Sequence, residues 1–131
     1  MKHSFTQRII YRDTDAEGVV YYANYLAFFE RGRTEFFTQL GVSLRKLKEE
    51  QDLVFAITDV ECHYKAPARY EDDVTVTTEI ADVTKTRIAF RQEVLRGTTL
   101  LVTARISACA IKLATFKPGP IPEQVAALLN H

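Results

Sequence analysis

The sequence lacks an excess of charge of either sign, and it lacks long apolar runs. Its 131 residues include 17 basic and 17 acidic side chains, so the formal net charge is zero. A chain without a basic excess is not expected to bind nucleic acid or an anionic membrane surface. No apolar run reaches the roughly 18 residues of a membrane-spanning helix, which predicts that there is no transmembrane segment. The first residues also lack the apolar stretch of a secretory signal.

Cysteine is scarce as well. Cys62 and Cys109 form no CxxC pair and have no cluster of histidines beside them. This spacing argues against a metal site, and no metal or other cofactor is expected. Because free cysteine packs as a small hydrophobic residue, both are expected to be reduced, buried thiols. A reducing, cytoplasmic location fits these absences.

The remaining composition is that of one globular domain spanning residues 1–131. Hydrophobic residues make up 47% of the chain and charged residues 26%, which is typical of globular proteins. A domain of this size buries less of its apolar surface than a larger one does. We therefore expect the chain to associate with a partner subunit.

A long amphipathic helix is predicted over residues 24–40. Asn24 is a candidate for its N-cap, and Gly41 is well placed to end it in a left-handed conformation. Gly32 lies within the apolar stripe, where it costs about 1 kcal/mol of helix propensity relative to alanine. We expect this glycine to allow a close approach to a sheet. The stripe recurs at intervals of three to four residues or their doubles and comprises Tyr25, Phe29, Phe36 and Leu40.

Strands are predicted on both sides of this helix. Alternating apolar and polar residues, rich in β-branched and aromatic types, indicate half-buried strands. Short helices are expected over 43–51, with Ser43 as the cap, and over 123–130. One strand, a long helix and then long strands joined by short turns predict an α+β fold, in which a curved antiparallel sheet wraps the helix. The expected strands cover residues 4–13, 53–65, 73–84, 87–96 and 99–114.

The segment between the first strand and the helix carries the chemistry. Asp13 and Asp15 precede a turn at Gly18 and the start of the helix. A helix N-terminus presents unpaired N–H groups and a partial positive charge, which stabilise an oxyanion. An aspartate beside it is ionised at neutral pH, since its unperturbed pKa is about 3.9. Carboxylate and amide together suffice for acyl transfer from a thioester. Alternate residues of a strand share a face, so these considerations do not separate Asp13 from Asp15.

The stretch D-T-D-A-E-G-V-V-Y-Y-A-N-Y, residues 13–25, resembles the signature of the 4-hydroxybenzoyl-CoA thioesterase family of hotdog proteins. The likeness extends through FFERGRTEFF and HYKAPARYEDD, and it is closest to the bacterial acyl-CoA thioesterases associated with the Tol–Pal cluster. The resemblance implies a hotdog fold, in which a curved antiparallel sheet wraps a long central helix. It also implies an acyl-CoA substrate and a homodimer or homotetramer with active sites at the subunit interface. An acyl carrier protein is the alternative thiol donor.

The resemblance implies that Asp15 is the catalytic carboxylate and that the backbone N–H of Tyr22 binds the thioester carbonyl. Asp13 is then expected to brace the turn. Many relatives of the Tol–Pal type have histidine where this chain has Tyr22. The backbone donor survives that change, but a histidine side chain's contribution is lost, which leaves acyl specificity open. The other residues of the signature expected to contact substrate are Gly18, Val19, Asn24 and Tyr25.

Cations are needed for the phosphates of CoA. Candidates near the ends of predicted strands or in turns are Lys65, Arg69, Lys85 and Arg87, with Lys112 as a further one. Each of them alone is also typical of a solvated surface charge.

Calcium binding is an alternative reading of the same segment. Asp13, Asp15, Glu17 and Gly18 match positions 1, 3, 5 and 6 of an EF-hand loop. The bidentate glutamate of position 12 is replaced by Asn24, and a strand rather than a helix is expected before the loop. Calcium binding is therefore disfavoured.

Other hydrolase and hotdog chemistries are also disfavoured. No GxSxG elbow is present. A hotdog dehydratase would need a catalytic histidine beside an acid, and the segment has none. His3 and His131 are expected to lie at frayed termini. His63 is expected to be structural within a strand, and Glu61 on the same strand face is a weak candidate for a second polar group. A non-catalytic acyl-thioester-binding or protein-interaction module remains the alternative function, since a fold alone does not determine activity.

Overall fold

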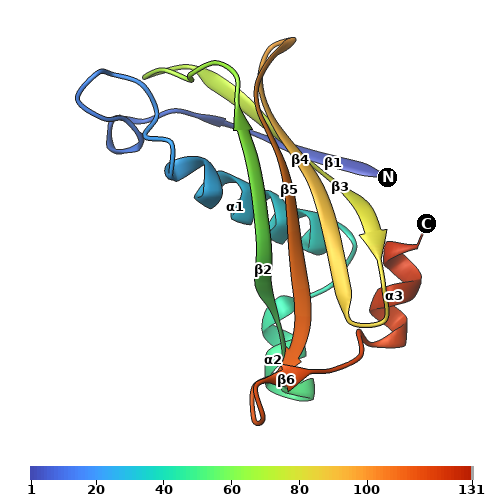
Figure 1. The fold of residues 1–131 in the computed structure, drawn as a ribbon. Helices are drawn as coiled ribbons and strands as arrows, with labels where there is room; N and C mark the ends of the chain where they lie inside the picture. The colour runs from blue at the N-terminus through green and yellow to red at the C-terminus, as the bar shows by residue number, and fades with distance from the viewer. Residues whose placement is uncertain (131) are drawn as a thin grey trace.

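One antiparallel sheet of six strands curves around a long helix in the computed structural model, which describes residues 1–130 (Figure 1). His131 lies outside the described residues. The elements, in chain order, are β1 (Lys2–Arg8), α1 (Asn24–Gln39), α2 (Leu44–Gln51), β2 (Leu53–Tyr64), β3 (Asp73–Val83), β4 (Arg87–Arg96), β5 (Thr99–Lys112), β6 (Lys117–Pro118) and α3 (Glu123–Leu129). The α+β architecture expected from the sequence is confirmed.

The sheet has the strand order β1-β3-β4-β5-β2, with β6 paired to β5. All neighbouring strands are antiparallel. The register shifts between Ile57 and Asp59 in β2 and between Ile80 and Asp82 in β3. Such bulges bend a strand and increase its twist, which helps the sheet to wrap α1. β1 and β2 form the two edges of the sheet.

The apolar face of α1 packs onto the concave side of this sheet. The predicted stripe is confirmed for Tyr25, Phe29 and Phe36, whereas Leu40 is only partly buried. Phe28 and Phe37 widen the stripe. The first half of α1 contributes to one core cluster and the second half to another, which also takes in α2 and α3.

The close approach expected at Gly32 is confirmed. A Cβ atom at this position would lie 2.8 Å from Thr78 Oγ1 and 2.9 Å from Gln92 Nε2. Gln92 is fully buried, and its Nε2 donates to the carbonyl of Phe29 at 2.9 Å and to Thr78 Oγ1 at 2.8 Å. The sheet therefore hydrogen-bonds to the backbone of α1 at the point where the helix has no side chain.

The strand predicted over residues 4–13 is wrong at its C-terminal end, because β1 stops at Arg8 and residues Tyr11–Asp13 form a 3-10 turn. The N–H of Ile9 donates to the carbonyl of Asp72, the residue just before the start of β3. The N–H of Ile10 then donates to the Asp13 carboxylate at 2.9 Å. This side-chain acceptor replaces a ladder partner and turns the chain out of the sheet.

Two expectations about single residues also need correction. Cys109 is buried, but Cys62 is only partly buried because it lies on the edge strand β2; both cysteines are free. His3 is not part of a frayed terminus: it lies within β1, and its ring packs edge-on against Phe36 with centroids 4.9 Å apart.

Among the described residues, no helix combines the length and the apolar character needed to cross a membrane.

Candidate active site

The segment between β1 and α1 folds back on itself and presents Asp15 at the base of a tight turn. Thr14 and Val20 form an antiparallel bridge. The N–H of Asp15 donates to the carbonyl of Val19 at 2.9 Å, and the N–H of Gly18 donates to the carbonyl of Asp15 at 3.0 Å. Gly18 has a φ of 79°, a left-handed conformation that glycine adopts without a steric penalty. We call residues 13–22 the Asp15 loop.

Asp13 braces this loop, as expected. Its carboxylate accepts from the N–H of Ile10. Its carbonyl accepts from the N–H of Tyr21 at 3.1 Å and from Nδ2 of Asn24 at 2.8 Å. The prediction of Asn24 as an N-cap is therefore wrong: Asn24 is the first residue of α1, and its amide donates to the loop instead of accepting from the helix. This bond ties the helix start to the loop.

The carboxylate of Asp15 is only partly engaged. Its Oδ1 accepts from the N–H of Glu17 at 2.9 Å, which orients the side chain. Within residues 1–130, no group donates a hydrogen bond to its Oδ2. Asp15 is partly buried, while Glu17 is exposed. One oxygen therefore positions the carboxylate and the other is free to react.

A second segment, which follows β2, holds the Asp15 loop from the other side. Val19 forms a bridge with Arg69, and the N–H of Val20 donates to the carbonyl of Ala68 at 2.9 Å. The N–H of Ala68 donates to the phenol oxygen of Tyr25 at 3.0 Å. Tyr25 is only 3% exposed, so this bond is made in the core. The signature residues Val19 and Tyr25 therefore both contact this second segment.

Tyr22 precedes α1 and borders a pocket. Among the described residues, none accepts a hydrogen bond from its backbone N–H. The pocket has a volume of about 240 Å³, and Tyr22, Tyr25, Tyr64 and Lys65 are among the residues that line it. Burial raises the pKa of both Tyr25 and Tyr64, so both phenols stay protonated at neutral pH. The site thus combines an open amide at a helix start with a pocket lined by phenols.

The candidate cations divide between the two ends of the sheet. Lys65 lines the pocket beside Tyr22, and Arg69 pairs with the Asp15 loop. Lys85 and Arg87 lie at the β3–β4 turn, next to α3 and at the opposite end of the sheet from the Asp15 loop (Figure 1). Lys112 donates its Nζ to a backbone carbonyl at 2.8 Å. Within one chain, only Lys65 and Arg69 are brought to the site.

Sequence reasoning missed the part that Tyr64 and Ala68 play in the site. The strand predicted over 53–65 includes Tyr64, and the sequence assigns no role in the site to either residue. The only signal was the likeness of HYKAPARYEDD to the family, since contacts between distant segments leave no local pattern. Glu61 and His63 are exposed on β2 and do not line the pocket.

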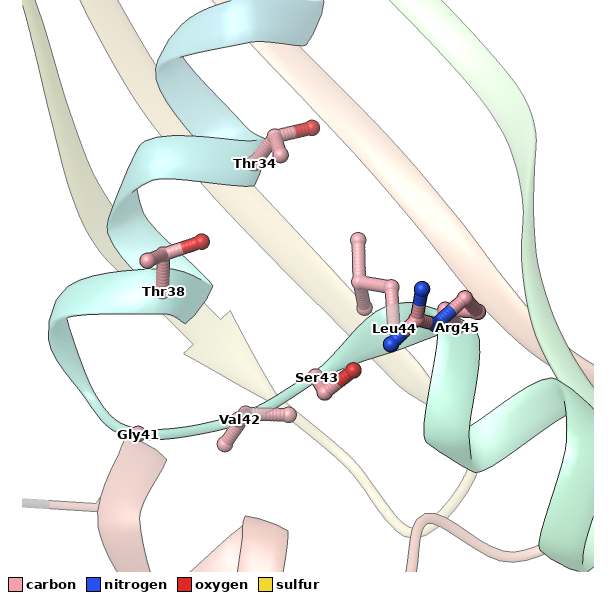
Figure 2. A pocket seen from close by; sticks show the side chains of 7 residues that line it. All are labelled: Thr34, Thr38, Gly41, Val42, Ser43, Leu44 and Arg45. Carbon is pink, nitrogen blue, oxygen red and sulfur yellow. The ribbon is translucent and has the colours of Figure 1, made fainter.

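A larger hollow, of about 540 Å³, lies at the other end of α1. Figure 2 shows Thr34 and Thr38 on the helix facing the connection to α2, with Leu44 directed into the space between. It is lined by no carboxylate and lies roughly three to four turns of helix away from the Asp15 loop. Its size therefore does not make it the site of the chemistry.

The fold and the sequence match a known family. The model of the thioesterase-like superfamily covers residues 11–129. The acyl-CoA thioesterase YbgC of Haemophilus influenzae is 39% identical over 128 residues, which is 98% of this chain and 94% of that protein.

Solved structures give the same result. A probable thioesterase from Bartonella henselae has a TM-score of 0.89 and 34% identity, and the match covers 93% of this chain and all of that one. A 4-hydroxybenzoyl CoA thioesterase mutant in complex with 4-hydroxybenzoyl CoA has a TM-score of 0.91 at 21% identity, over 98% of each chain, which is a likeness of fold. The expected hotdog fold is confirmed, and the chain belongs to the thioesterase-like superfamily.

Proposed function

We propose that this protein hydrolyses an acyl-CoA thioester to a free acid and CoA. In this proposal Asp15 is the nucleophile or general base, and the backbone N–H of Tyr22 donates to the carbonyl oxygen. The observation that carries the proposal is the half-engaged carboxylate of Asp15, in a loop that is tied to the start of α1. The H. influenzae relative is named an acyl-CoA thioesterase, which supports CoA rather than an acyl carrier protein as the thiol donor.

Two routes use the same groups. In the first, Asp15 Oδ2 attacks the thioester carbon, the C–S bond breaks to release CoA thiolate, and water hydrolyses the resulting mixed anhydride. In the second, Asp15 takes a proton from a water molecule as that water attacks the same carbon. In both, negative charge develops on the carbonyl oxygen, and the amide of Tyr22 stabilises it together with the positive end of α1.

We also propose that the working unit is a homodimer that forms along β2, with a homotetramer as its further assembly. β2 is an edge strand of 12 residues, and Ile57, Val60 and Tyr64 on it are 46%, 48% and 47% exposed. A long edge with unpaired backbone groups is a template for pairing with another chain. A second copy would also bring its own Lys85 and Arg87, which within one chain lie away from the Asp15 loop.

A cytoplasmic location is part of the same proposal. Cys62 and Cys109 are both free thiols, and Cys62 is partly exposed on the edge strand. Free thiols persist in a reducing compartment.

The test is thiol release from a panel of short-chain, long-chain and aromatic acyl-CoAs. Asp15→Asn keeps an acceptor for the Glu17 N–H but removes the charge, so we expect kcat to fall by about 100-fold or more. Glu17→Gln is the matched control: it makes the same change two residues away, on an exposed side chain, and should leave kcat within about twofold. Undiminished turnover by Asp15→Asn would reject the assignment. No turnover of any thioester by the wild type would favour a binding module.

A further inference from the structure

Arg33 is a cation that the proposed reaction does not use. It follows Gly32 on α1, is partly buried, and donates from Nη1 to Oε1 of the buried Gln92 at 3.1 Å. Among residues 1–130, no carboxylate lies within ion-pair distance of its guanidinium. Burial lowers the pKa of Arg33, while the charge of Glu30 raises it. A guanidinium that is partly buried and makes one hydrogen bond, to an amide oxygen, keeps donors that can bind an anion.

A cavity of about 290 Å³ lies beside Arg33, between α1 and the strands β2, β4 and β5. We call this cavity the Arg33 pocket. Its walls include Phe37, Phe55 and Phe90. The rings of Phe37 and Phe55 are stacked, 5.6 Å apart and inclined by 15°, and the Phe90 ring stands edge-on to Phe37. The pocket thus has one cationic donor, the carboxylate of Glu30 and a mostly apolar remainder, which is the usual make-up of a small-molecule site.

The Arg33 pocket adjoins the hollow drawn in Figure 2. Thr34 and Leu44 line both spaces. Figure 2 shows the Leu44 side chain reaching up between α1 and the sheet, on the side that Thr34 faces. A ligand held at Arg33 therefore has room to extend its apolar part toward the α1–α2 connection. Arg33 is roughly 14 Å along the helix axis from Asn24, so within one chain this space is separate from the pocket at Tyr22.

We propose that the Arg33 pocket binds a small carboxylate with an apolar body. The guanidinium donates to the carboxylate oxygens, and the apolar body packs against Phe37 and Phe55. A planar guanidinium matches a carboxylate in a two-pronged hydrogen bond, and the bond to Gln92 fixes its orientation beforehand. Glu30 lies at the exposed rim, where solvent and salt screen its repulsion. Such a ligand has the chemistry of the acid that a thioesterase releases, but its binding does not depend on catalysis.

Octanoate is the probe, and octanol, which has the same apolar chain without the charge, is the matched ligand. Binding is followed by calorimetry and by the methyl NMR signals of the full-length protein. Octanoate should bind at least about tenfold more tightly than octanol, and it should shift the methyl signals of Leu44, which lines the Arg33 pocket and lies outside the proposed dimer edge. The methyl signals of Val20, which lines the pocket at Tyr22, should not move.

Arg33→Gln should weaken octanoate binding by at least about tenfold and leave octanol binding unchanged. Arg31→Gln, an exposed arginine two residues away on the same helix, is the control and should bind as the wild type does. Equal binding of octanoate by Arg33→Gln, or shifts at Val20 alone, would overturn the proposal. A wild type that does not bind octanoate would also overturn it. A changed oligomeric state of Arg33→Gln would do the same, because the pocket would then belong to a contact between copies. If Arg33→Gln does not fold, the comparison of octanoate with octanol on the wild type still decides.

Discussion

The two oxygens of the Asp15 carboxylate have different surroundings, which suits a group that must be both held and reactive. Oδ1 accepts from the Glu17 N–H, and Oδ2 receives no hydrogen bond from the described residues. Asp13 is engaged in the structure of the loop instead. Its carboxylate accepts from the N–H of Ile10, and its carbonyl accepts from the side-chain amide of Asn24 at the start of α1. Strand geometry alone left Asp13 and Asp15 open as alternatives, the family resemblance implied Asp15, and this difference in surroundings also favours Asp15.

The proposed donor role of the Tyr22 backbone predicts that replacing its side chain and removing its N–H have different effects on kcat. Tyr22→Phe keeps the N–H, so kcat should change by less than about fivefold, whereas Tyr22→Pro removes the N–H and should lower kcat by about 100-fold. Steady-state kinetics on the best acyl-CoA measures both.

Ala23→Pro is the control for the general effect of proline next to the site. Ala23 has a φ of −68°, which proline adopts without strain. A loss of activity in Ala23→Pro as large as in Tyr22→Pro would contradict the assignment of the donor to position 22.

At the scale of elements, the contact between α1 and the sheet depends on the missing side chain at Gly32. Gly32→Ala should gain helix propensity of about 1 kcal/mol but lose more through overpacking against Thr78 and Gln92, for a net loss on the order of 1 kcal/mol. Urea unfolding measures the change in free energy. Thr34→Ala, at an exposed position of the same helix, should not destabilise the protein. Equal or greater stability of Gly32→Ala would show that the sheet yields at this point.

The elements were predictable where the signal is local, and not where it depends on distant segments. Ser43 as the cap of α2 follows from its neighbours alone, and its Oγ accepts from the N–H of Lys46. Gly41 likewise ends α1 with a φ of 81°, as predicted. The early end of β1 depends on Asp72, and the role of Asn24 depends on Asp13 across the loop. Contacts between segments that are distant in the sequence leave no periodic pattern of apolar residues from which they could be predicted.

At the scale of the whole molecule, the free edge of β2 predicts a specific interface. Val60→Lys places a charge in the middle of that edge and should shift the protein from dimer to monomer, with a loss of thioesterase activity if a partner copy completes the site. Sedimentation at several concentrations gives the oligomeric state. Ser4→Lys puts the same charge on β1, the opposite edge, and should leave the assembly intact. A monomeric wild type, or dissociation caused by Ser4→Lys, would contradict this interface.

The hydrogen bonds from the Asp15 loop to Ala68 have a consequence for synthesis. The ribosome releases the whole signature, residues 13–25, well before the segment that holds it in place. A nascent chain that ends before Ala68 therefore contains Asp15 but lacks the acceptor for Val20 and the donor to Tyr25. The Asp15 loop can therefore be held in its final conformation only after β2 and Ala68 have emerged and folded back onto the first residues made.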